Sequence, residues 1–288
     1  MRPAWILTLL LAGILAWPAA ADEGFGPPNP VSSFSKAKRL ARDDVYADHH
    51  TTLYCACQFT PNKKGTGGTI GTRAGIFNAE GCGYEVRKSE TRGRRLEWEH
   101  IVPASRFGQR LACWQDGHAV CVTSKGKPYR GRKCCAKVNE EFEHAEADLH
   151  NLAPSVGELN GDRSNHPYDI LAPEDEADET ATPQATAKHR LYGTCNFEVD
   201  GRPKAAEPMP DIRGDVARIW FYMSRAYDFD LSPASFDLFA GWHAADPVEE
   251  AGDAWEKQRD RRIQAIQGNS NPYIHGLEPI PEDFGVEP

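Results

Sequence analysis

Beyond its first 21 residues, the chain has no apolar run of the roughly 20 residues that a transmembrane helix needs. This absence argues against a membrane-spanning protein, and we expect the mature chain to be soluble. The opening stretch, MRPAWILTLLLAGILAWPAAA, is apolar but short, with a basic residue at Arg2 and three alanines at its end. Such a stretch is typical of a secretory signal peptide. We therefore interpret residues 1–21 as a signal peptide and residues 22–288 as the mature protein, periplasmic or secreted.

Zinc-binding motifs are also missing. The eight cysteines include no Cys-x2-Cys pair, and the segment HAEADLH differs from the His-Glu-x-x-His motif of zinc hydrolases. A zinc cluster and a zinc hydrolase are both disfavoured for that reason. An even number of cysteines behind an export signal favours disulfides formed in an oxidising compartment. Eight cysteines permit on the order of 100 pairings, and the sequence does not rank them.

Positive charge is scarce overall, because the formal net charge is -9. This balance argues weakly against a polyanionic partner. The basic residues are nevertheless clustered, from Arg87 to Arg110 and from Lys125 to Lys137, while acidic residues gather in PEDEADE at 173–179. Salt confines the field of such a cluster to roughly 8–10 Å, so a basic face can bind phosphates on an acidic protein. The alternative is a solvated basic surface without a partner.

The hydrophobic pattern predicts an α+β fold with more helix than strand. No internal repeat or linker is evident, so we expect a single, mostly helical domain. Residues 166–190 are polar and acidic and predict a long mobile loop. Helices are expected at 33–49, 140–152, 211–227, 232–246 and 249–268, and strands at 51–59, 83–88 and 94–103.

Two of these expectations concern chemistry-bearing residues. In a helix over 140–152, Glu146 and His150 are four residues apart and would share a face. Pro154 is predicted to occupy the first turn of a second helix that carries Asn160. Aromatic residues at helical spacing in the last third are assigned to the core.

The segment LEWEHIVPASR places an acid and a histidine, Glu99 and His100, next to each other in the strand predicted at 94–103. Adjacent side chains on a strand point to opposite faces. If both residues serve one site, the strand must end or twist around Glu99. Regular alternation through Val102 would count against a shared site.

Hydrolysis of a phosphodiester needs a base, a cation for the leaving oxygen and donors for the phosphoryl oxygens. Histidine suits the first task because its ordinary pKa, about 6.5, lies near neutral pH. Carboxylate and amide oxygens suit Mg²⁺, and the planar guanidinium of arginine suits phosphate. Each of these signals is weak when it is taken alone.

Longer words carry more information. YCAC, GCGYEVRK, RLEWEHIVPASRFGQ, CWQDG, EADLHNLAPSVGELNGDRSN, RGDVARIWFYM and QGNSNPY follow each other in this order between about Tyr54 and Tyr273. Together they resemble the bacterial endonuclease I family, which consists of exported, non-specific DNA and RNA nucleases. The resemblance implies a ββα-metal (His-Me finger) motif stapled by disulfides. It also implies one Mg²⁺ ion, products with 5′-phosphate ends and a monomer that binds the phosphate backbone of DNA and RNA.

By this resemblance, His100 corresponds to the general base that activates water. Glu99 and Asn160 correspond to the metal ligands, and Glu146 to a further active-site acid that acts through a metal-bound water. His150 and Asn151 are expected to brace the site through hydrogen bonds.

The sequence departs from the family after CWQDG, where an insertion displaces the arginine that binds phosphate. A gap placed before GRKCC puts this arginine at Arg132, and Arg130 is the competing candidate. The alternative function is a cysteine-rich exported protein that binds nucleic acid without cleaving it. That alternative leaves Glu99, His100 and Asn160 unexplained.

Overall fold

A computed structural model describes residues 31–71, 81–171, 190–201, 204–248, 254–276 and 280. The expected signal peptide and most of the loop expected at 166–190 lie outside these ranges. Within them, no helix is both long and apolar enough to cross a membrane. The structure is a mixed α+β fold, as the sequence predicts, and it contains two antiparallel sheets.

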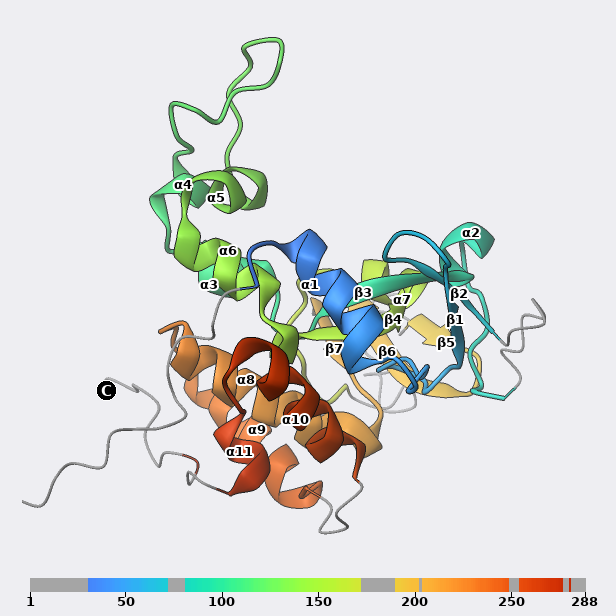
Figure 1. Ribbon diagram of the computed structural model, residues 1–288. Coiled ribbons are helices and arrows are strands. Elements are labelled where there is room, and N and C mark those ends of the chain that lie inside the picture. The colour runs from blue at the N-terminus through green and yellow to red at the C-terminus, as the bar shows by residue number, and fades with distance from the viewer. Residues whose placement is uncertain are drawn as a thin grey trace, which may run out of the picture.

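Two groups of helices can be seen in Figure 1, α3 to α6 in the upper left and α8 to α11 below. The helical elements are α1 (Phe34–Leu40), η1 (Ala41–Val45), α2 (Glu90–Gly93), α3 (Ala104–Gly108), α4 (Ala112–Gln115), α5 (Arg132–Val138), α6 (Glu140–Ala147), η2 (Leu149–Asn151), α7 (Gly157–Arg163), η4 (Pro210–Ile212), α8 (Arg213–Ala226), α9 (Pro233–Ala245), α10 (Trp255–Gln267) and α11 (Pro272–His275).

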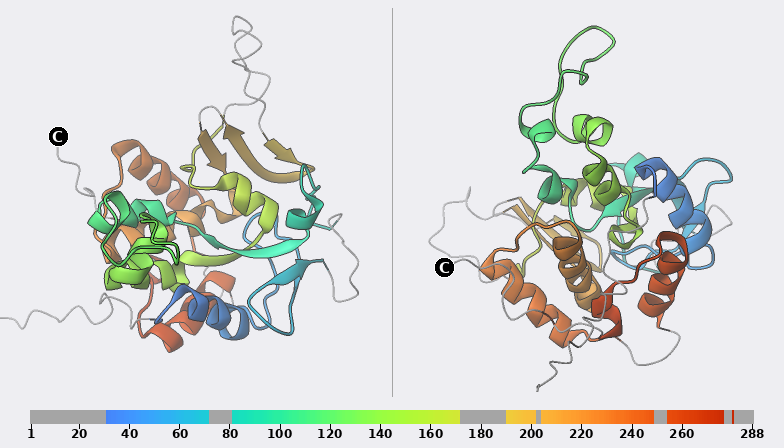
Figure 2. Two further views of the ribbon diagram at one scale, coloured as in Figure 1. Left: turned by 90° about the horizontal axis from the view of Figure 1, so that it is seen from above. Right: turned by 60° about the vertical axis from the view of Figure 1, so that its left-hand side comes forward.

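The first sheet has the order β1-β2-β3-β4 and the second the order β5-β6-β7, and every pairing is antiparallel. The strands are β1 (Phe59–Pro61), β2 (Gly68–Ile70), β3 (Arg95–His100), β4 (Leu152–Val156), β5 (Arg190–Tyr192), β6 (Cys195–Gly201) and β7 (Lys204–Glu207). The strands β3 and β4 pair with each other, and the helix α7 follows β4 directly along the chain (Figure 2).

The helices of the last third begin and end where the sequence predicts, give or take a few residues. Ser232 caps α9 and Pro233 takes its first position, while α10 ends at Gly268 in the left-handed conformation, which glycine adopts without strain. Trp220 and Phe239 are buried in the main core, so the assignment of these aromatic side chains to the core is confirmed.

The prediction that Pro154 begins a helix is wrong. Pro154 lies in β4 opposite Trp98, and α7 starts only at Gly157. Proline has no N–H to give to a sheet, but its carbonyl here accepts a hydrogen bond from the backbone N–H of Leu53 at 2.8 Å. Pro154 therefore occupies a strand position that does not require a donor.

The shared helical face of Glu146 and His150 is also not formed. The helix α6 ends at Ala147, because Asp148 has extended backbone angles and its carboxylate accepts a hydrogen bond from the N–H of His150 at 2.9 Å. Two tyrosine hydroxyls, of Tyr222 and Tyr227, donate to the same carboxylate. Tertiary contacts of Asp148 thus break a segment whose local pattern predicts one helix.

The strands predicted at 51–59 and 83–88 are largely wrong. Cys55 and Ala56 have φ of 65° and 49°, so residues 53–56 form a turn, and Thr52 accepts a hydrogen bond from the N–H of Cys57 at 2.9 Å. From 83 to 88 only Tyr84 makes an isolated bridge. The sheet β5-β6-β7 was not predicted.

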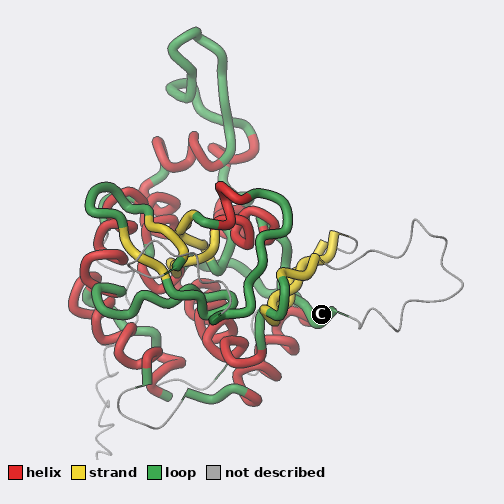
Figure 3. Tube along the Cα trace, turned by 90° about the vertical axis from the view of Figure 1, so that its right-hand side faces the viewer, coloured by secondary structure: helices red, strands yellow, loops and turns green. Residues whose placement is uncertain are grey.

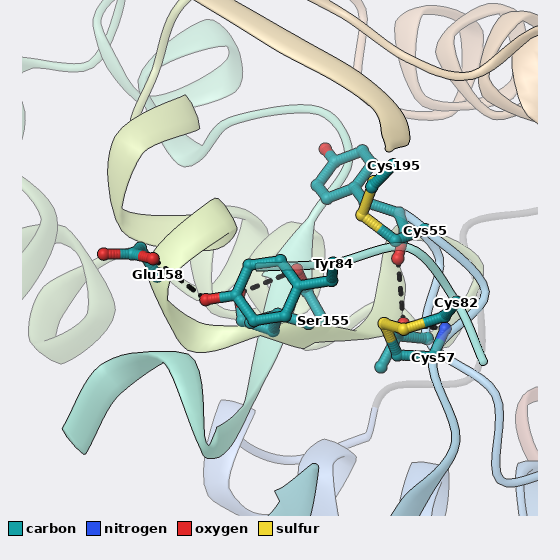
Figure 4. Close-up of a disulfide and its surroundings, with 10 residues drawn as sticks. Cys55, Cys57, Cys82, Tyr84, Ser155, Glu158 and Cys195 are labelled. Atoms are coloured by element: carbon teal, nitrogen blue, oxygen red, sulfur yellow. Dashed lines mark hydrogen bonds between the residues drawn. A yellow bond between two sulfur atoms is a disulfide. The ribbon is translucent and has the colours of Figure 1, made fainter. Parts of the chain in front are cut away.

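All eight cysteines form disulfides, which confirms the preference over a zinc cluster. Figure 4 shows Cys55–Cys195 and Cys57–Cys82, which tie the turn at 53–56 to β6 and to the segment before Tyr84. The other two pairs are Cys113–Cys135 and Cys121–Cys134. The first two disulfides thus hold irregular segments in places where the sequence predicted strands.

A smaller core joins the two ends of the described chain. Side chains from α1, η1, β3, β4 and α10 pack together there, among them Val45, Trp98 and Ile263. Arg259 of α10 is buried beside this core and donates to the carbonyls of Leu149, His150 and Leu152 at 2.8–3.1 Å. Its Nε also donates to the hydroxyl of Tyr46 at 2.9 Å.

We predict that Arg259→Met lowers the free energy of unfolding by about 3 kcal/mol or more, because it leaves buried carbonyls without a donor. Lys257→Met on the same helix is the control and should change stability by less than about 0.5 kcal/mol. Urea unfolding followed by circular dichroism measures both. Equal effects of the two substitutions would contradict this account of Arg259.

Candidate active site

A cleft of about 480 Å³ lies at the end of β3 and is lined by residues that include members of α1, β3, α5 and α7. Four of the five predicted site residues line it: Glu99, His100, Arg132 and Asn160. They lie up to 61 positions apart (160 minus 99) in the sequence. A second cleft, of about 800 Å³, lies beside Gln58 and contains none of them.

The strand β3 ends at His100, so alternation does not continue through Val102. Two buried side chains hold the chain where it leaves the strand. Arg163 donates to the carbonyls of His100 and Ile101 at 2.8 and 2.6 Å, and Asn151 bonds both backbone groups of Val102, at 2.7 and 3.0 Å. Glu99 and His100 consequently line the same cleft, and the expectation that Asn151 braces the site is confirmed.

His100 is buried and its tautomer is fixed by one contact. Its Nε2 lies 2.8 Å from the carbonyl oxygen of Glu146, which can only accept, so Nε2 carries the proton. The other nitrogen, Nδ1, is therefore an acceptor, and Nη2 of Arg132 is 3.4 Å from it. Burial and the nearby charge of Arg132 lower the pKa of His100 to about 3. The neutral ring is thus ready to take a proton.

Glu99 is almost fully buried, and one of its oxygens is occupied. Oε1 accepts from the hydroxyl of Tyr54 at 2.8 Å and lies 3.1 Å from Nη1 of Arg163. Burial raises the pKa of Glu99 to about 7, although the charge of Arg163 acts in the opposite direction. Within the described part of the chain, Oε2 has no hydrogen-bond partner.

Asn160 is oriented by a carboxylate that the sequence did not single out. Its Nδ2 donates to Oε2 of Glu97 at 3.0 Å, so its carbonyl oxygen is the atom left for another partner. Glu97 also binds Arg92 and Arg95. Burial raises the pKa of Glu97, but these two arginines outweigh it and the pKa lies below its ordinary value. Glu97 therefore stays charged and holds the amide.

Arg132 and Arg130 occupy different places. The guanidinium of Arg132 lines the cleft and lies 5.2 Å from the ring centre of Phe34. Arg130 lies in a separate depression and donates to the carbonyl of Gln115 at 2.7 Å. Of the two candidates for phosphate binding, only Arg132 reaches the residues of the cleft.

Glu146 does not line the cleft, and its carboxylate pairs with Nε of Arg132. Through its carbonyl it also receives the hydrogen bond of His100. One residue of α6 thus positions both the imidazole and the guanidinium. This arrangement does not depend on the helical face that Glu146 was expected to share with His150.

The donors around the cleft suit a hard divalent cation. A carboxylate oxygen of Glu99 and the amide oxygen of Asn160 are oxygen ligands of the type that Mg²⁺ prefers, and Mg²⁺ keeps several waters in such sites. The described residues contain no cluster of three or more His, Cys, Asp or Glu side chains able to hold a metal ion. A site of this composition fits Mg²⁺ better than zinc.

Three residues of the site were missed by sequence reasoning: Glu97, Arg163 and Phe34. Glu97 lies in the word LEWEH between the apolar Leu96 and Trp98, and a charged residue in such a place is a signal that it needs a partner. Arg163 lies in the word GELNGDR between polar neighbours, which give no such signal. Phe34 packs against His100 with ring centres 4.7 Å apart. Nothing in the sequence near residue 34 indicates this contact.

Comparison with known proteins shows which family the chain resembles. The family described as Endonuclease I matches residues 34–278. The chain is 34% identical to Endonuclease-1 of Buchnera aphidicola over 245 residues. This aligned region is 85% of this chain and 81% of that protein. It is 35% identical to an extracellular deoxyribonuclease of Aeromonas hydrophila, over 93% of this chain and 96% of that one. A periplasmic deoxyribonuclease of the same organism is 36% identical over 80% of each chain.

The family match covers most of the chain and includes all the residues that line the cleft. The chain therefore belongs to the endonuclease I family.

Proposed function

We propose that this protein is an exported Mg²⁺-dependent endonuclease that hydrolyses the phosphodiester bonds of DNA and also of RNA. The observation that carries the proposal is the convergence of Glu99, His100, Arg132 and Asn160 on one cleft. Relatives named extracellular and periplasmic deoxyribonuclease support DNA as the substrate and export as the destination. In this proposal β3, β4 and α7 form the ββα-metal motif of a single domain, and the protein acts as a monomer.

His100 is the proposed general base. Its Nδ1 carries the lone pair that can take a proton, since Nε2–H is bound to the carbonyl of Glu146 and Nδ1 has only the 3.4 Å contact with Nη2 of Arg132. A pKa lowered to about 3 keeps the imidazole neutral at pH 7, so that Nδ1 can accept a proton from the attacking water. The hydrogen bond at Nε2 keeps the ring aimed at the cleft while this proton moves. Cleavage with water attacking phosphorus and the 3′ oxygen leaving gives 5′-phosphate ends.

Glu99 and Asn160 are the proposed ligands for Mg²⁺. When bound there, the ion would neutralise the negative charge that develops on the leaving oxygen. Tyr54 and Arg163 hold Oε1 of Glu99, so Oε2 is presented without a change of rotamer. Glu97 performs the equivalent task for Asn160 through the amide nitrogen.

Arg132 is the proposed phosphate-binding residue. Its side chain is 42% exposed, and its planar guanidinium can donate to two phosphoryl oxygens while Nε stays on Glu146. Glu146 is then a positioning residue for both Arg132 and His100. Its additional role through a metal-bound water stays a prediction.

We expect His100→Ala to lower the rate of plasmid cleavage by about 10²–10⁴-fold, the usual loss when a well-placed base is removed. His144→Ala is the control, because His144 lies on α6 outside the cleft. Agarose-gel assays of plasmid DNA and of RNA give the rates. Cleavage by His100→Ala at the parent rate would contradict the assignment, and binding without any cleavage by the parent would favour the alternative nucleic-acid-binding protein.

EDTA should stop cleavage and added Mg²⁺ should restore it. Binding can also be read without activity, because a ligand present at 100 times its Kd stabilises the folded state by about 2.7 kcal/mol. Mg²⁺ should therefore raise the Tm of the parent and of Glu90→Gln, whose side chain is exposed, but not of Glu99→Ala or Asn160→Ala. Full activity after exhaustive chelation would overturn the metal assignment.

The two arginine candidates can be separated by single-turnover rates at saturating plasmid, where affinity does not enter. Arg132→Met should lower the rate by about 10- to 100-fold, because charged hydrogen bonds contribute about 1.5–3 kcal/mol. Arg130→Met should leave the rate within about threefold, as expected of a side chain that binds only the carbonyl of Gln115. The reverse ranking would move the phosphate site to Arg130.

A further inference from the structure

Residues 117–131 form an arm that projects from the body of the protein beyond α4 and α5 (Figure 1). The right-hand view of Figure 2 and the side view in Figure 3 show the same projection, so it is not an effect of one orientation. The arm includes the segment after CWQDG that was interpreted above as an insertion. The mechanism proposed for the cleft uses none of its side chains.

The arm has a defined backbone. Val122 and Pro128 form a bridge, and the N–H of Thr123 donates to the carbonyl of Lys127 at 2.8 Å. Gly126 has a φ of 74° and completes the turn at the tip. The base is fastened by the disulfide Cys121–Cys134. Little conformational entropy is therefore left to lose when the arm binds a partner.

The charge of the arm is of one sign, which is unusual in a chain with a net charge of -9. From residue 117 to 131 there are three Lys and Arg residues, Lys125, Lys127 and Arg130, and no Asp or Glu. Lys125 and Lys127 at the tip are exposed, and within the described residues neither has an ion pair. Unpaired cations on a rigid projection favour a polyanion over a neutral or basic partner.

The arm also leads directly into the cleft. Lys127 is five positions before Arg132, and an extended chain covers at most about 3.3–3.6 Å per residue, so their backbones lie within about 18 Å. Phosphates follow each other every 3.4 Å or so along one DNA strand. The distance from Arg132 to Lys127 is therefore at most that of about five base pairs of duplex, and to Lys125 at most that of about seven.

Resting on the nuclease function proposed above, we propose that this arm is a second contact for double-stranded DNA. Lys125 and Lys127 bind backbone phosphates within about seven base pairs of the bond that is cleaved. The contact reads no bases, since lysine to phosphate bonds fix position and carry no sequence information. It increases affinity for long duplexes, whereas the chemistry stays with the residues of the cleft.

The test measures the salt dependence of binding to a 30-base-pair duplex, by fluorescence anisotropy in a His100→Ala background that does not cut the probe. Each phosphate contact contributes about 0.9 to the slope of log K against log salt. Lys125→Gln/Lys127→Gln should lower the slope by about 1.8. Between 50 and 200 mM salt it should consequently lose about tenfold less affinity than its background.

Lys63→Gln/Lys64→Gln is the matched control, because it removes two exposed lysines from the hairpin turn between β1 and β2. It should keep the full slope. An unchanged slope for the arm variant, or an equal loss in the control, overturns the proposal. Thermal unfolding and a non-reducing peptide map confirm that each variant is folded with Cys121–Cys134 intact.

The outcome is independent of whether the protein cuts DNA. If the parent protein fails to cleave plasmid, the proposed function falls while the anisotropy slope still reports on the arm. If the parent cleaves but the slope does not change, only the arm contact is refuted. A partner protein, which the exposed Val120 and Val122 could contact instead, would leave the slope for DNA unchanged.

Discussion

The site depends on the interactions of one buried group, the guanidinium of Arg163. It pairs with Glu99 and donates to the carbonyls of His100 and Ile101. An unpaired charge at this depth would cost several kcal/mol, so each partner requires the other. Because one group binds both the side chain of Glu99 and the backbone after it, it ends the strand and fixes the acid in a single arrangement.

A second buried network holds the surrounding scaffold. Asp148 accepts from Tyr222 and Tyr227 of the helical last third, and Arg259 donates to carbonyls of η2 and of the first residue of β4. These contacts tie α8 and α10 to the segment that delivers Glu146 and β4. Helices that lie distant in sequence thus determine where the imidazole of His100 finds its acceptor. The separation of His150 from Glu146 follows from the same network, since Asp148 ends α6.

The sequence predicted the site better than the fold around it. Glu99, His100, Asn160 and Arg132 stand in long words that resemble one family, and all four line the cleft. Local rules failed where tertiary contacts outweigh propensity. Pro154 suits a helix start but lies opposite Trp98 in the sheet, and residues 53–56 look strand-like but turn because of two cysteines that are bonded to distant partners. Partners separated by many residues leave no periodic signal.

The proposed function requires two things of the cleft, phosphate binding and a neutral general base, and these place opposite demands on its charge. A phosphate site needs positive charge, and a general base needs to lose its own. In the proposed mechanism Arg132 meets both needs, because its charge would attract the phosphate and it also lowers the pKa of His100, which burial has already lowered. Glu146 keeps the guanidinium in place without lying in the cleft. The acidic balance of the whole chain is therefore compatible with a polyanionic substrate, since the field that matters is set within a few ångströms of Arg132.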